Sequence, residues 1–254
     1  MTSESKNVLI TGAATRIGRA LALGMALEGW TIALHYHGSQ SEAEATAKDI
    51  ENAGGRAHLL QANLSDEAQT IALFDEATHK LGPLTCLINN ASVFEFDDFI
   101  TATPASWHAH MSVNLHAPFL LSQRFAQQLP TELEGNIINI IDQRVWKLTP
   151  DFTSYTLSKA GLWTLTQTAA QALAPRIRVN AIAPGPTLKG SRQSEENFSQ
   201  QVAAVPLQRQ PKLDEFCGAV NFILASASMT GQMIALDGGQ HLAWETPDVV
   251  GVDE

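Results

Sequence analysis

The stretch GNIINIIDQRVWKLTPDFTSYTLSKAGLWTL, residues 135–165, contains a strand, a loop and a helix that carry the most informative chemistry of this chain. Its apolar run at 137–141 is typical of a strand buried on both faces of a sheet. Asp142 stands at the end of that strand, and a helical pattern begins near Phe152. We expect a local polar side chain to cap the first turn of this helix; the candidates are Asp151, Thr153 and Ser154.

Tyr155 and Lys159 lie four residues apart and therefore share one face of the predicted helix. A phenol with its ordinary pKa of about 10 is a poor proton donor or acceptor at neutral pH. An ammonium about 4 Å away, at an effective dielectric constant of about 20, favours the phenolate by roughly 4 kcal/mol, or about three pKa units before desolvation. Such a pair can exchange a proton near neutrality. The same spacing is common on ordinary helices. A catalytic role for this pair is favoured because it follows a strand that ends in Asp142, and because the chain also contains the glycine-containing loop at 11–18.

Composition and charge describe a globular protein and exclude several classes of partner. Hydrophobic residues make up 44% of the 254 residues and charged residues 17%, so residues 1–254 are predicted to form a single domain. A net charge of −10 argues against nucleic acid or an anionic membrane as a partner. No signal peptide or membrane-spanning run is expected, and Cys86 and Cys217 are interpreted as buried free thiols, so we predict a cytoplasmic location.

Strands alternate with helices along the chain, which predicts an α/β fold with a parallel sheet covered by helices on both faces. Right-handed crossovers then give a doubly wound sheet whose ligand cleft lies at the carboxyl ends of the strands. The expected strands are 8–10, 31–36, 57–62, 84–88, 137–141, 177–182 and 233–236. The expected helices are 17–27, 41–53, 66–80, 152–173 and 213–225, with two more from about 104 and 114, and 184–210 is expected to be irregular.

The loop TGAATRIG at 11–18 joins the first strand to the first helix. Gly12 permits a tight turn there, and Gly18 permits the helix to pack closely against the strand. The amino terminus of the helix would then receive the pyrophosphate of a dinucleotide. A glycine turn can also be merely structural, but a strand, this loop and a helix at the start of a βαβ unit favour a dinucleotide site.

The end of the second strand bears on which dinucleotide is bound. A carboxylate at this point would hydrogen-bond the 2′-hydroxyl of NAD(H) and repel the 2′-phosphate of NADP(H). No carboxylate occurs there before Glu42. This absence favours NADP(H) as cofactor, and the alternative is that two histidines simply cap the strand. The candidate cofactor residues of this stretch are His35, Tyr36, His37, Gly38 and Ser39.

Polar and small residues also follow the other predicted strands. Each set stands where a different part of the cofactor would lie: Asn63 and Leu64 for the adenine, Asn90, Ala91 and Ser92 for the nicotinamide ribose, and Pro184 and Gly185 for the nicotinamide. Asn114 begins or interrupts a helix, where it would hold a water near Lys159 or cap the helix. No histidine pairs with Cys, Asp or Glu at ligand spacing, so no metal is expected.

Together these residues resemble the short-chain dehydrogenase/reductase family over essentially the whole chain. The matching motifs are Thr11-Gly12…Ile17-Gly18, Asn89-Asn90-Ala91, Asn114, Tyr155-x-x-x-Lys159 and Pro184-Gly185. The resemblance implies a seven-stranded Rossmann sheet, usually assembled as a homotetramer. It also implies that Tyr155 donates a proton, that Lys159 modulates Tyr155 and anchors the ribose, and that Asn114 holds a proton-relay water. To the cofactor residues already named it adds Arg16, Ile17, Ile140, Thr187 and Leu188.

Two residues depart from the usual pattern of that family. Arg16 stands where the family usually has glycine, and Asp142 stands where it usually has serine, thirteen residues before Tyr155. A serine there would donate a hydrogen bond to a carbonyl oxygen, which an ionised carboxylate cannot do. Ordinary alcohol or ketone chemistry is therefore doubtful, and a nitrogen-rich substrate that presents N–H donors fits better.

Both departures occur together in the pteridine reductase branch of the family, which this chain resembles. By that resemblance Phe94 stacks the pterin against the nicotinamide, Arg16 faces the phosphates and the pterin edge, and Ser92 contacts cofactor and substrate. Judged from the residues alone, Phe94 could equally be a core aromatic. The substrate residues implied are Arg16, Ser92, Phe94, Asp142 and Tyr155, and the catalytic residues are Asp142, Tyr155, Lys159 and Asn114.

These observations lead to one functional hypothesis and two alternatives. The hypothesis is an NADPH-dependent reduction of a dihydropterin, of the dihydromonapterin, dihydrobiopterin or dihydrofolate class, to the tetrahydropterin. The first alternative is a carbonyl or 3-oxoacyl reductase, which the missing serine disfavours. The second is a non-catalytic NADP(H)-binding sensor, which would not need to keep the Tyr155–Lys159 pair.

Overall fold

The computed structural model describes residues 6–190, 192–246 and 250, and it contains a seven-stranded parallel sheet in the order β3-β2-β1-β4-β5-β6-β7. The strands are β1 (Asn7–Ile10), β2 (Thr31–Tyr36), β3 (Arg56–Gln61), β4 (Cys86–Asn89), β5 (Gly135–Ile140), β6 (Ile177–Pro184) and β7 (Met233–Leu236). The α-helices are α1 (Arg16–Leu27), α2 (Gln40–Asn52), α3 (Glu67–Leu81), α4 (Pro104–Met111), α5 (Ala117–Gln128), α6 (Thr153–Leu173), α7 (Glu195–Ala203) and α8 (Leu213–Ala225). The predicted doubly wound α/β sheet is confirmed. Of the predicted domain 1–254, residues 1–5, 191, 247–249 and 251–254 lie outside the described residues.

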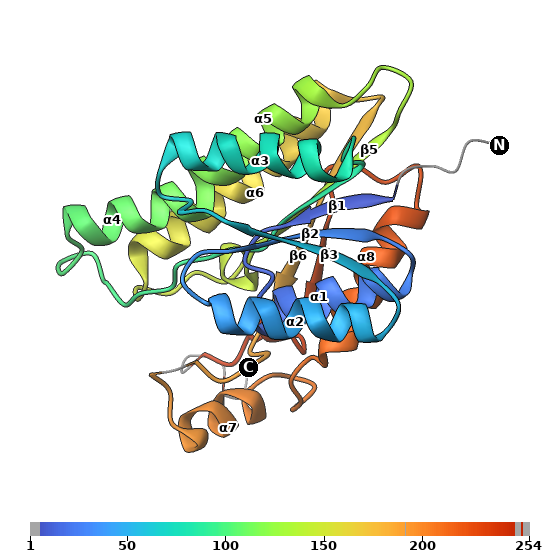
Figure 1. Ribbon diagram of the computed structural model, residues 1–254. Helices are drawn as coiled ribbons and strands as arrows, with labels where there is room; N and C mark the ends of the chain where they lie inside the picture. Colours follow the sequence, from blue (N-terminus) through green and yellow to red (C-terminus); the bar gives the residue numbers. More distant parts are fainter. Residues whose placement is uncertain (1–5, 191, 247–249, 251–254) are drawn as a thin grey trace.

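Two apolar cores, one on each face of the sheet, follow from the alternation of side chains along the strands. On β1, Val8 and Ile10 pack with the apolar faces of α1, α2 and α8, whereas Leu9 between them packs with α3 and α5. Figure 1 shows the same division, with α1, α2 and α8 on one face and α3, α5 and α6 on the other. Because both faces are covered, the central strands are mostly apolar, as the run at 137–141 predicted, although buried polar residues such as His35, Asn139 and Asn180 interrupt them.

The strand order reverses between β1 and β4, and this is where a doubly wound sheet opens its ligand crevice. The loops that leave β1 and β4 therefore diverge to opposite faces. The glycine loop follows β1, and Asn90 follows β4. The topology thus places these two predicted site segments side by side at the carboxyl edge of the sheet.

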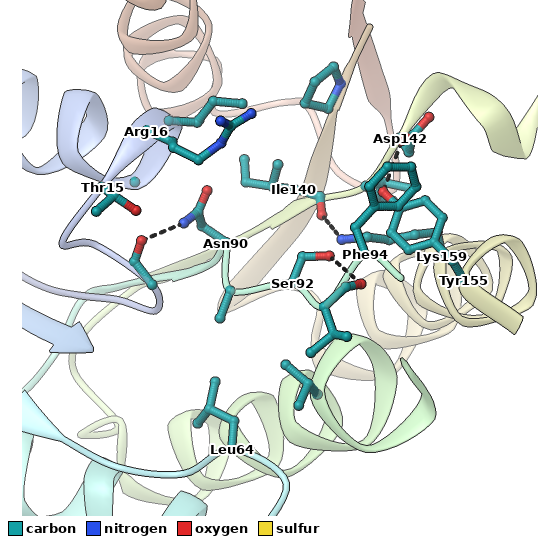
Figure 2. Close-up of a pocket in the computed structure, with 18 of the residues that line it drawn as sticks. Thr15, Arg16, Leu64, Asn90, Ser92, Phe94, Ile140, Asp142, Tyr155 and Lys159 are labelled. Atoms are coloured by element: carbon teal, nitrogen blue, oxygen red, sulfur yellow. Dashed lines mark hydrogen bonds between the residues drawn. The ribbon is translucent and has the colours of Figure 1, made fainter. Parts of the chain in front are cut away.

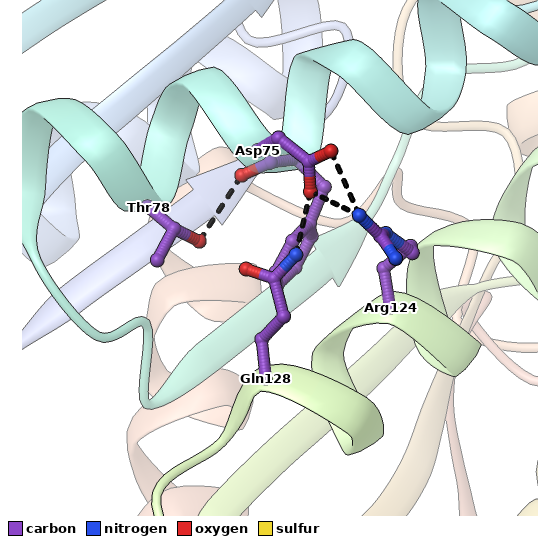
Figure 3. Close-up of polar contacts among 5 residues, drawn as sticks. Asp75, Thr78, Arg124 and Gln128 are labelled. Carbon is purple, nitrogen blue, oxygen red and sulfur yellow. Dashed lines mark hydrogen bonds and ion pairs between the residues drawn. The ribbon is translucent and has the colours of Figure 1, made fainter.

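A polar contact joins α3 to α5 on one face of the sheet (Figure 3). The carboxylate of Asp75 accepts hydrogen bonds from the guanidinium of Arg124 and from the side-chain amide of Gln128. The side chains of Arg124 and Asp75 are 32% and 44% exposed, so we expect a contribution of about 1 kcal/mol or less. The contact joins two helices that also pack through the edge-on pair Phe74 and Phe125.

The segment 184–210 was expected to be irregular, and this prediction is wrong because it contains α7. The side chain of Ser194 caps this helix by accepting from the backbone N–H of Asn197, and two glutamates occupy its first turn. None of its residues is buried, so it lacks the apolar periodicity by which helices are found in sequences.

The expected local cap of α6 is also wrong. Phe152 occupies the N-cap position in a left-handed conformation, with φ of 58°, and no side chain at this point caps the helix. Asp97 does so instead: its backbone carbonyl accepts from the N–H of Phe152, and its carboxylate accepts from the N–H of Ser154. Rules that search adjacent residues cannot find a cap supplied by a distant loop.

Three further expectations concern Asn114, the two cysteines and membrane-spanning helices. A π-helical turn, η1 (Ser112–His116), separates α4 from α5, so Asn114 does interrupt a helix. Both cysteines are free thiols; Cys86 is buried as expected, but Cys217 is only partly buried. Within the described ranges, no helix combines the length and hydropathy needed to cross a membrane.

Candidate active site

A cleft of about 510 Å³ opens at the carboxyl ends of the strands, within the range usual for small-molecule sites (Figure 2). The predicted residues that line it are Gly12, Arg16, Ile17, Gly18, His35, His37, Asn63, Leu64, Asn90, Ala91, Ser92, Phe94, Ile140, Asp142, Tyr155, Lys159, Pro184, Gly185, Thr187 and Leu188. The predicted residues that do not line it are Tyr36, Gly38, Ser39 and Asn114. The lining residues that the sequence did not indicate are Thr15, Val93, Val113 and Ile141.

The glycine loop approaches the β4 loop so closely that larger residues do not fit. Gly12 has φ of +62°, and a Cβ there would lie 3.0 Å from the Cα of Ala91. A Cβ on Gly18 would lie 2.1 Å from the carbonyl oxygen of Gly12. The side-chain amide of Asn90 donates to the carbonyls of Thr11 and Gly12 and so holds the two loops together. Backbone, not side chains, therefore forms this wall of the cleft.

The amino terminus of α1 fits a bound anion. Its N-cap residue, Thr15, makes no side-chain hydrogen bond to the helix, and the first turn contains no acidic residue. The first N–H groups of a helix have no partner inside the helix and carry its positive dipole end. A pyrophosphate placed here would meet free donors without meeting a carboxylate.

His35 supports the glycine loop and does not act as a charged phosphate ligand. Its Nδ1 accepts from the N–H of Gly12 at 3.0 Å, so its Nε2 donates to the carbonyl of Ala62 at 3.1 Å. Burial lowers the pKa of His35 to about 4, which keeps the imidazole neutral. Both imidazoles line the cleft, but His35 is buried and hydrogen-bonded to the loops on both sides, so only His37 is open to a cofactor.

The other three residues proposed from the end of β2 lie away from the cleft. Tyr36 is buried in the apolar core beneath α1 and α2, because alternation along the strand turns its side chain to that face. Gly38 is exposed, and Ser39 occupies the N-cap position of α2 without a side-chain hydrogen bond. Their assignment as cofactor residues has no support from the geometry.

Two arginines hold the segment that follows β6 against opposite walls of the cleft. The guanidinium of Arg16 donates to the carbonyls of Leu188 and Lys189, each at 2.9 Å. The guanidinium of Arg192 pairs with the carboxylate of Glu95 and donates to the carbonyl of Phe94. Thr187 and Leu188 are thereby placed over the cleft. The contacts of Arg16 with phosphates and a pterin edge stay predictions.

Asp142, Tyr155 and Lys159 meet where the end of β5 faces α6, as Figure 2 shows. The hydroxyl of Tyr155 donates to the Oδ2 of Asp142 at 2.9 Å, and the backbone N–H of Arg144 donates to its Oδ1 at 2.8 Å. Lys159 is 2% exposed, and its Nζ donates to the carbonyl of Ile140 at 2.9 Å. The carboxylate thus contacts the phenol directly, and the ammonium lies behind them.

The expected acidification of Tyr155 by Lys159 does not occur in this arrangement. Burial and the adjacent Asp142 carboxylate raise the pKa of Tyr155 well above its ordinary value. The Asp142 carboxylate contacts the hydroxyl directly at 2.9 Å. The Nζ of Lys159, in contrast, lies 5.9 Å from the centre of the Tyr155 ring and donates to the carbonyl of Ile140. A negative charge in direct contact disfavours the phenolate. Tyr155 is therefore a protonated hydroxyl at neutral pH, and its raised pKa makes it a weaker acid than a free phenol.

Lys159 has its pKa lowered from 10.5 to about 8, chiefly by burial, with the charge of Asp142 acting in the opposite direction. This difference corresponds to roughly 3 kcal/mol. The unfolded chain holds the proton more tightly than the folded chain between these pKa values. Stability should therefore rise as the pH increases from 8 to 10.5, because the folded protein loses a costly buried charge.

We expect Lys159→Met to raise the free energy of unfolding at pH 7 by about 2 kcal/mol, since loss of the hydrogen bond to Ile140 offsets part of the gain. Urea unfolding of both proteins at pH 7 and at pH 10 measures this difference. It should shrink toward the higher pH. A variant no more stable than the wild type at pH 7, or a gap that does not change with pH, would contradict the expectation.

Asn114 connects the β4 loop to α6. Its side chain is fully buried, with Oδ1 accepting from the N–H of Val93 and Nδ2 donating to the carbonyl of Val93 and to the Oγ of Ser158. It fixes the loop that carries Ser92 and Phe94. The role of Asn114 as holder of a proton-relay water stays a prediction.

Phe94 is a cleft residue and not a core aromatic, since it is 43% exposed. Its ring stacks on that of Phe152, with centres 4.4 Å apart and planes at 14°, and meets the ring of Tyr155 edge-on at 4.6 Å. Ser92, near the same wall, donates its hydroxyl to the carbonyl of Val93. An aromatic surface therefore adjoins the Tyr155–Asp142 pair. In the described part of the chain, no three His, Cys, Asp or Glu side chains are grouped to hold a metal ion.

The model of the family described as short chain dehydrogenase matches residues 6–200. The chain belongs to the short-chain dehydrogenase family. This short-chain dehydrogenase is 32% identical, over 94% of its length and 99% of the relative's, to 3-oxoacyl-[acyl-carrier-protein] reductase FabG of Staphylococcus aureus. Membership confirms the family resemblance drawn from the motifs, and it makes the protein an oxidoreductase.

Two solved structures are more similar to this short-chain dehydrogenase. One is FolM alternative dihydrofolate reductase 1 from Brucella suis in complex with NADP, at 50% identity and a TM-score of 0.93, covering 96% of this chain and 98% of that one. The other is the same-named protein from Brucella canis with NADP, at 50% identity and a TM-score of 0.93, covering 96% and 97%. These structures agree with the pteridine reductase-like character that Arg16 and Asp142 indicated.

Proposed function

We propose that this short-chain dehydrogenase reduces the C=N bond of a dihydropterin with NADPH to give the tetrahydropterin. The observation that carries the proposal is the hydrogen bond between the Tyr155 hydroxyl and the Asp142 carboxylate inside the cleft. The carboxylate occupies the place where the family usually has a serine. The 50% identity to the FolM dihydrofolate reductases supports the same substrate class.

The residues of the cleft fit NADP(H) as cofactor. The open amino terminus of α1 and the glycine loop would hold the pyrophosphate, and His37 stands at the end of β2 without a neighbouring carboxylate on the cleft wall. Lys159 and Tyr155 would hold the nicotinamide ribose. When bound, NADPH supplies the hydride for the reaction. The crystallised relatives with NADP support this choice.

The chain's own contribution is a proton and a fixed geometry. Tyr155 is protonated at neutral pH, and its single hydroxyl hydrogen would pass from the Asp142 hydrogen bond to the ring nitrogen as the adjacent carbon receives the hydride, leaving a phenolate that solvent reprotonates. Asp142 keeps the hydroxyl oriented, and its remaining lone pairs accept N–H groups of an aminopyrimidine ring. Phe94 offers its ring to one face of the substrate. A ketone oxygen in the same place would meet a carboxylate that has no hydrogen to donate.

A second candidate, a carbonyl or 3-oxoacyl reductase, is favoured by the 32% identity to FabG. A substrate panel separates the two candidates. Dihydromonapterin, dihydrobiopterin, dihydrofolate, simple ketones and a 3-oxoacyl thioester are each assayed with NADPH and with NADH. We expect at least about 100-fold higher kcat/KM for one of the dihydropterins than for any ketone, because an unsatisfied polar contact costs about 1–3 kcal/mol or more at a reacting centre.

Reduction of ketones without reduction of any dihydropterin would overturn the proposal in favour of the second candidate. NADPH binding without oxidation by any substrate would instead support a non-catalytic sensor. A preference for NADH would contradict the cofactor assignment. The homotetramer and the cytoplasmic location stay predictions.

A further inference from the structure

A buried polar network lies outside the cleft, beneath the start of α6. It consists of Asp97 from the loop after β4, His110 from α4 and Ser154 from α6. The residues are 2%, 0% and 0% exposed. None of the three lines the cleft, and the mechanism described above uses none of them. Buried polar groups of this kind rigidify a structure when every member is satisfied.

The partners fix the direction of each hydrogen bond. The backbone N–H and the hydroxyl of Ser154 both donate to the Asp97 carboxylate, so the Ser154 oxygen accepts from Nδ1–H of His110 at 2.6 Å. The Nε2 of His110 is then free to accept from the N–H of Glu95, at 3.0 Å. Ser106 contributes another hydroxyl to the same carboxylate. All of these polar groups are paired.

The ionisation states agree with these directions. Burial lowers the pKa of His110, which keeps the imidazole neutral and leaves Nε2 able to accept. Burial alone would raise the pKa of Asp97, but hydrogen bonds from Ser154 and Ser106 hold it below its ordinary value. The ionised carboxylate then lies at the positive end of the α6 dipole, where a negative charge is stabilising.

The network joins the two walls that face the substrate. Asp97 and Glu95 belong to the segment that begins with Ser92 and Phe94, whereas Ser154 directly precedes Tyr155 in α6. α6 has no cap of its own, so its first turn is fixed to the rest of the protein through Asp97. The imidazole of His110 also meets the Tyr155 ring edge-on, with centres 5.9 Å apart.

We propose that Asp97, Ser154 and His110 are positioning residues that set the Tyr155 hydroxyl against the Phe94 ring. The inference rests on the proposed function only in giving Tyr155 the role of proton donor. Near-attack geometry is sensitive, and a displacement of about 1 Å can reduce a rate by about 100-fold. Disruption of the network should therefore lower kcat while leaving NADPH binding nearly unchanged, because the glycine loop and the start of α1, which would hold the pyrophosphate, lie outside the network.

The first test compares Ser154→Ala with a buried hydroxyl deletion elsewhere on the same helix. Ser154→Ala removes the link between His110 and Asp97 but keeps the backbone N–H cap. The matched control is Thr166→Val, whose hydroxyl is also fully buried in α6 and bonded to Asn139. We expect Ser154→Ala to lower kcat for the dihydropterin at least about tenfold and Thr166→Val less than about twofold. Both should lower Tm.

The second test removes the two hydrogen bonds of His110, to Ser154 and to Glu95, one at a time. Asparagine retains a donor near the position of Nδ1, whereas glutamine retains an acceptor near the position of Nε2. We expect His110→Gln to lower kcat about as much as Ser154→Ala does, because the hydrogen bond to Ser154 is lost. We expect His110→Asn to raise KM for the dihydropterin with kcat nearly retained, because the bond to Glu95 in the Phe94 segment is lost.

The outcomes separate positioning from a purely structural role. Recovery of kcat in Ser154→Thr, which restores the hydroxyl, supports the inference. Equal effects of Ser154→Ala and Thr166→Val on kcat, or the same change in kcat and KM for both His110 variants, would overturn it. If the wild type reduces only ketones, the proposed function fails, and the same variants assayed with the ketone still decide the inference.

Discussion

Tyr155→Phe is expected to lower kcat for the dihydropterin by about 1,000-fold, the middle of the range for loss of a general acid. Phenylalanine keeps the ring that packs edge-on against Phe94 and His110, so the shape of the cleft should persist. What is lost is the hydroxyl that donates to Asp142 and holds the proton for the substrate. NADPH should bind with nearly unchanged affinity, because the glycine loop and the start of α1 are untouched.

Single-turnover oxidation of NADPH measures the chemical step, and quenching of protein fluorescence measures the dissociation constant of NADPH. Thermal unfolding provides the control for folding. If kcat stays within tenfold of the wild type, the proton comes from another group. If NADPH binding is lost instead, Tyr155 serves chiefly as a cofactor ligand.

Asp142→Ser is expected to lower kcat/KM for the dihydropterin by about 100-fold or more and to raise it for simple ketones. The variant replaces a charged acceptor by a hydroxyl, so the aminopyrimidine N–H groups lose a charge-assisted partner. A ketone oxygen gains a donor in the same place. The pKa of Tyr155 should also fall, because the carboxylate that raises it is absent.

Asp142→Asn is the matched control for charge. The amide keeps the shape of the side chain and can still accept from the N–H of Arg144, but it carries no negative charge. We expect it to lose dihydropterin reduction about as severely as the serine variant, because the amide nitrogen that replaces Oδ2 donates and cannot accept the aminopyrimidine N–H groups. Steady-state kinetics with both substrate types measure the switch. Full dihydropterin activity in either variant would show that the carboxylate does not contact the reacting ring.

Much of the site could be predicted because parallel strands bring their carboxyl ends to one edge. Gly12 follows β1, Asn90 follows β4 and Asp142 follows β5, so their convergence needs only the strand order. The four-residue spacing of Tyr155 and Lys159 likewise places both on one helix face. Periodicity and topology are enough for such residues.

The predictions that were wrong concern contacts between residues far apart in the chain. Asp97 caps α6 across 57 residues, which no local rule detects. The relation between Tyr155 and Lys159 was inferred from spacing alone, but burial and the nearer Asp142 reversed the expected direction of the pKa change. Electrostatic effects depend on distance and depth, and a sequence reports neither.

Arg16 occupies a left-handed backbone conformation, with φ of 55°, where glycine would be unstrained and other residues lose about 1–2 kcal/mol. Its guanidinium spans from the first loop to carbonyls 172 and 173 residues later in the chain. Glycine at this position would relieve the strain but would also remove both hydrogen bonds, so the loops after β1 and β6 would no longer be joined there. A mutant library at this position should therefore be screened for thermostability and turnover together.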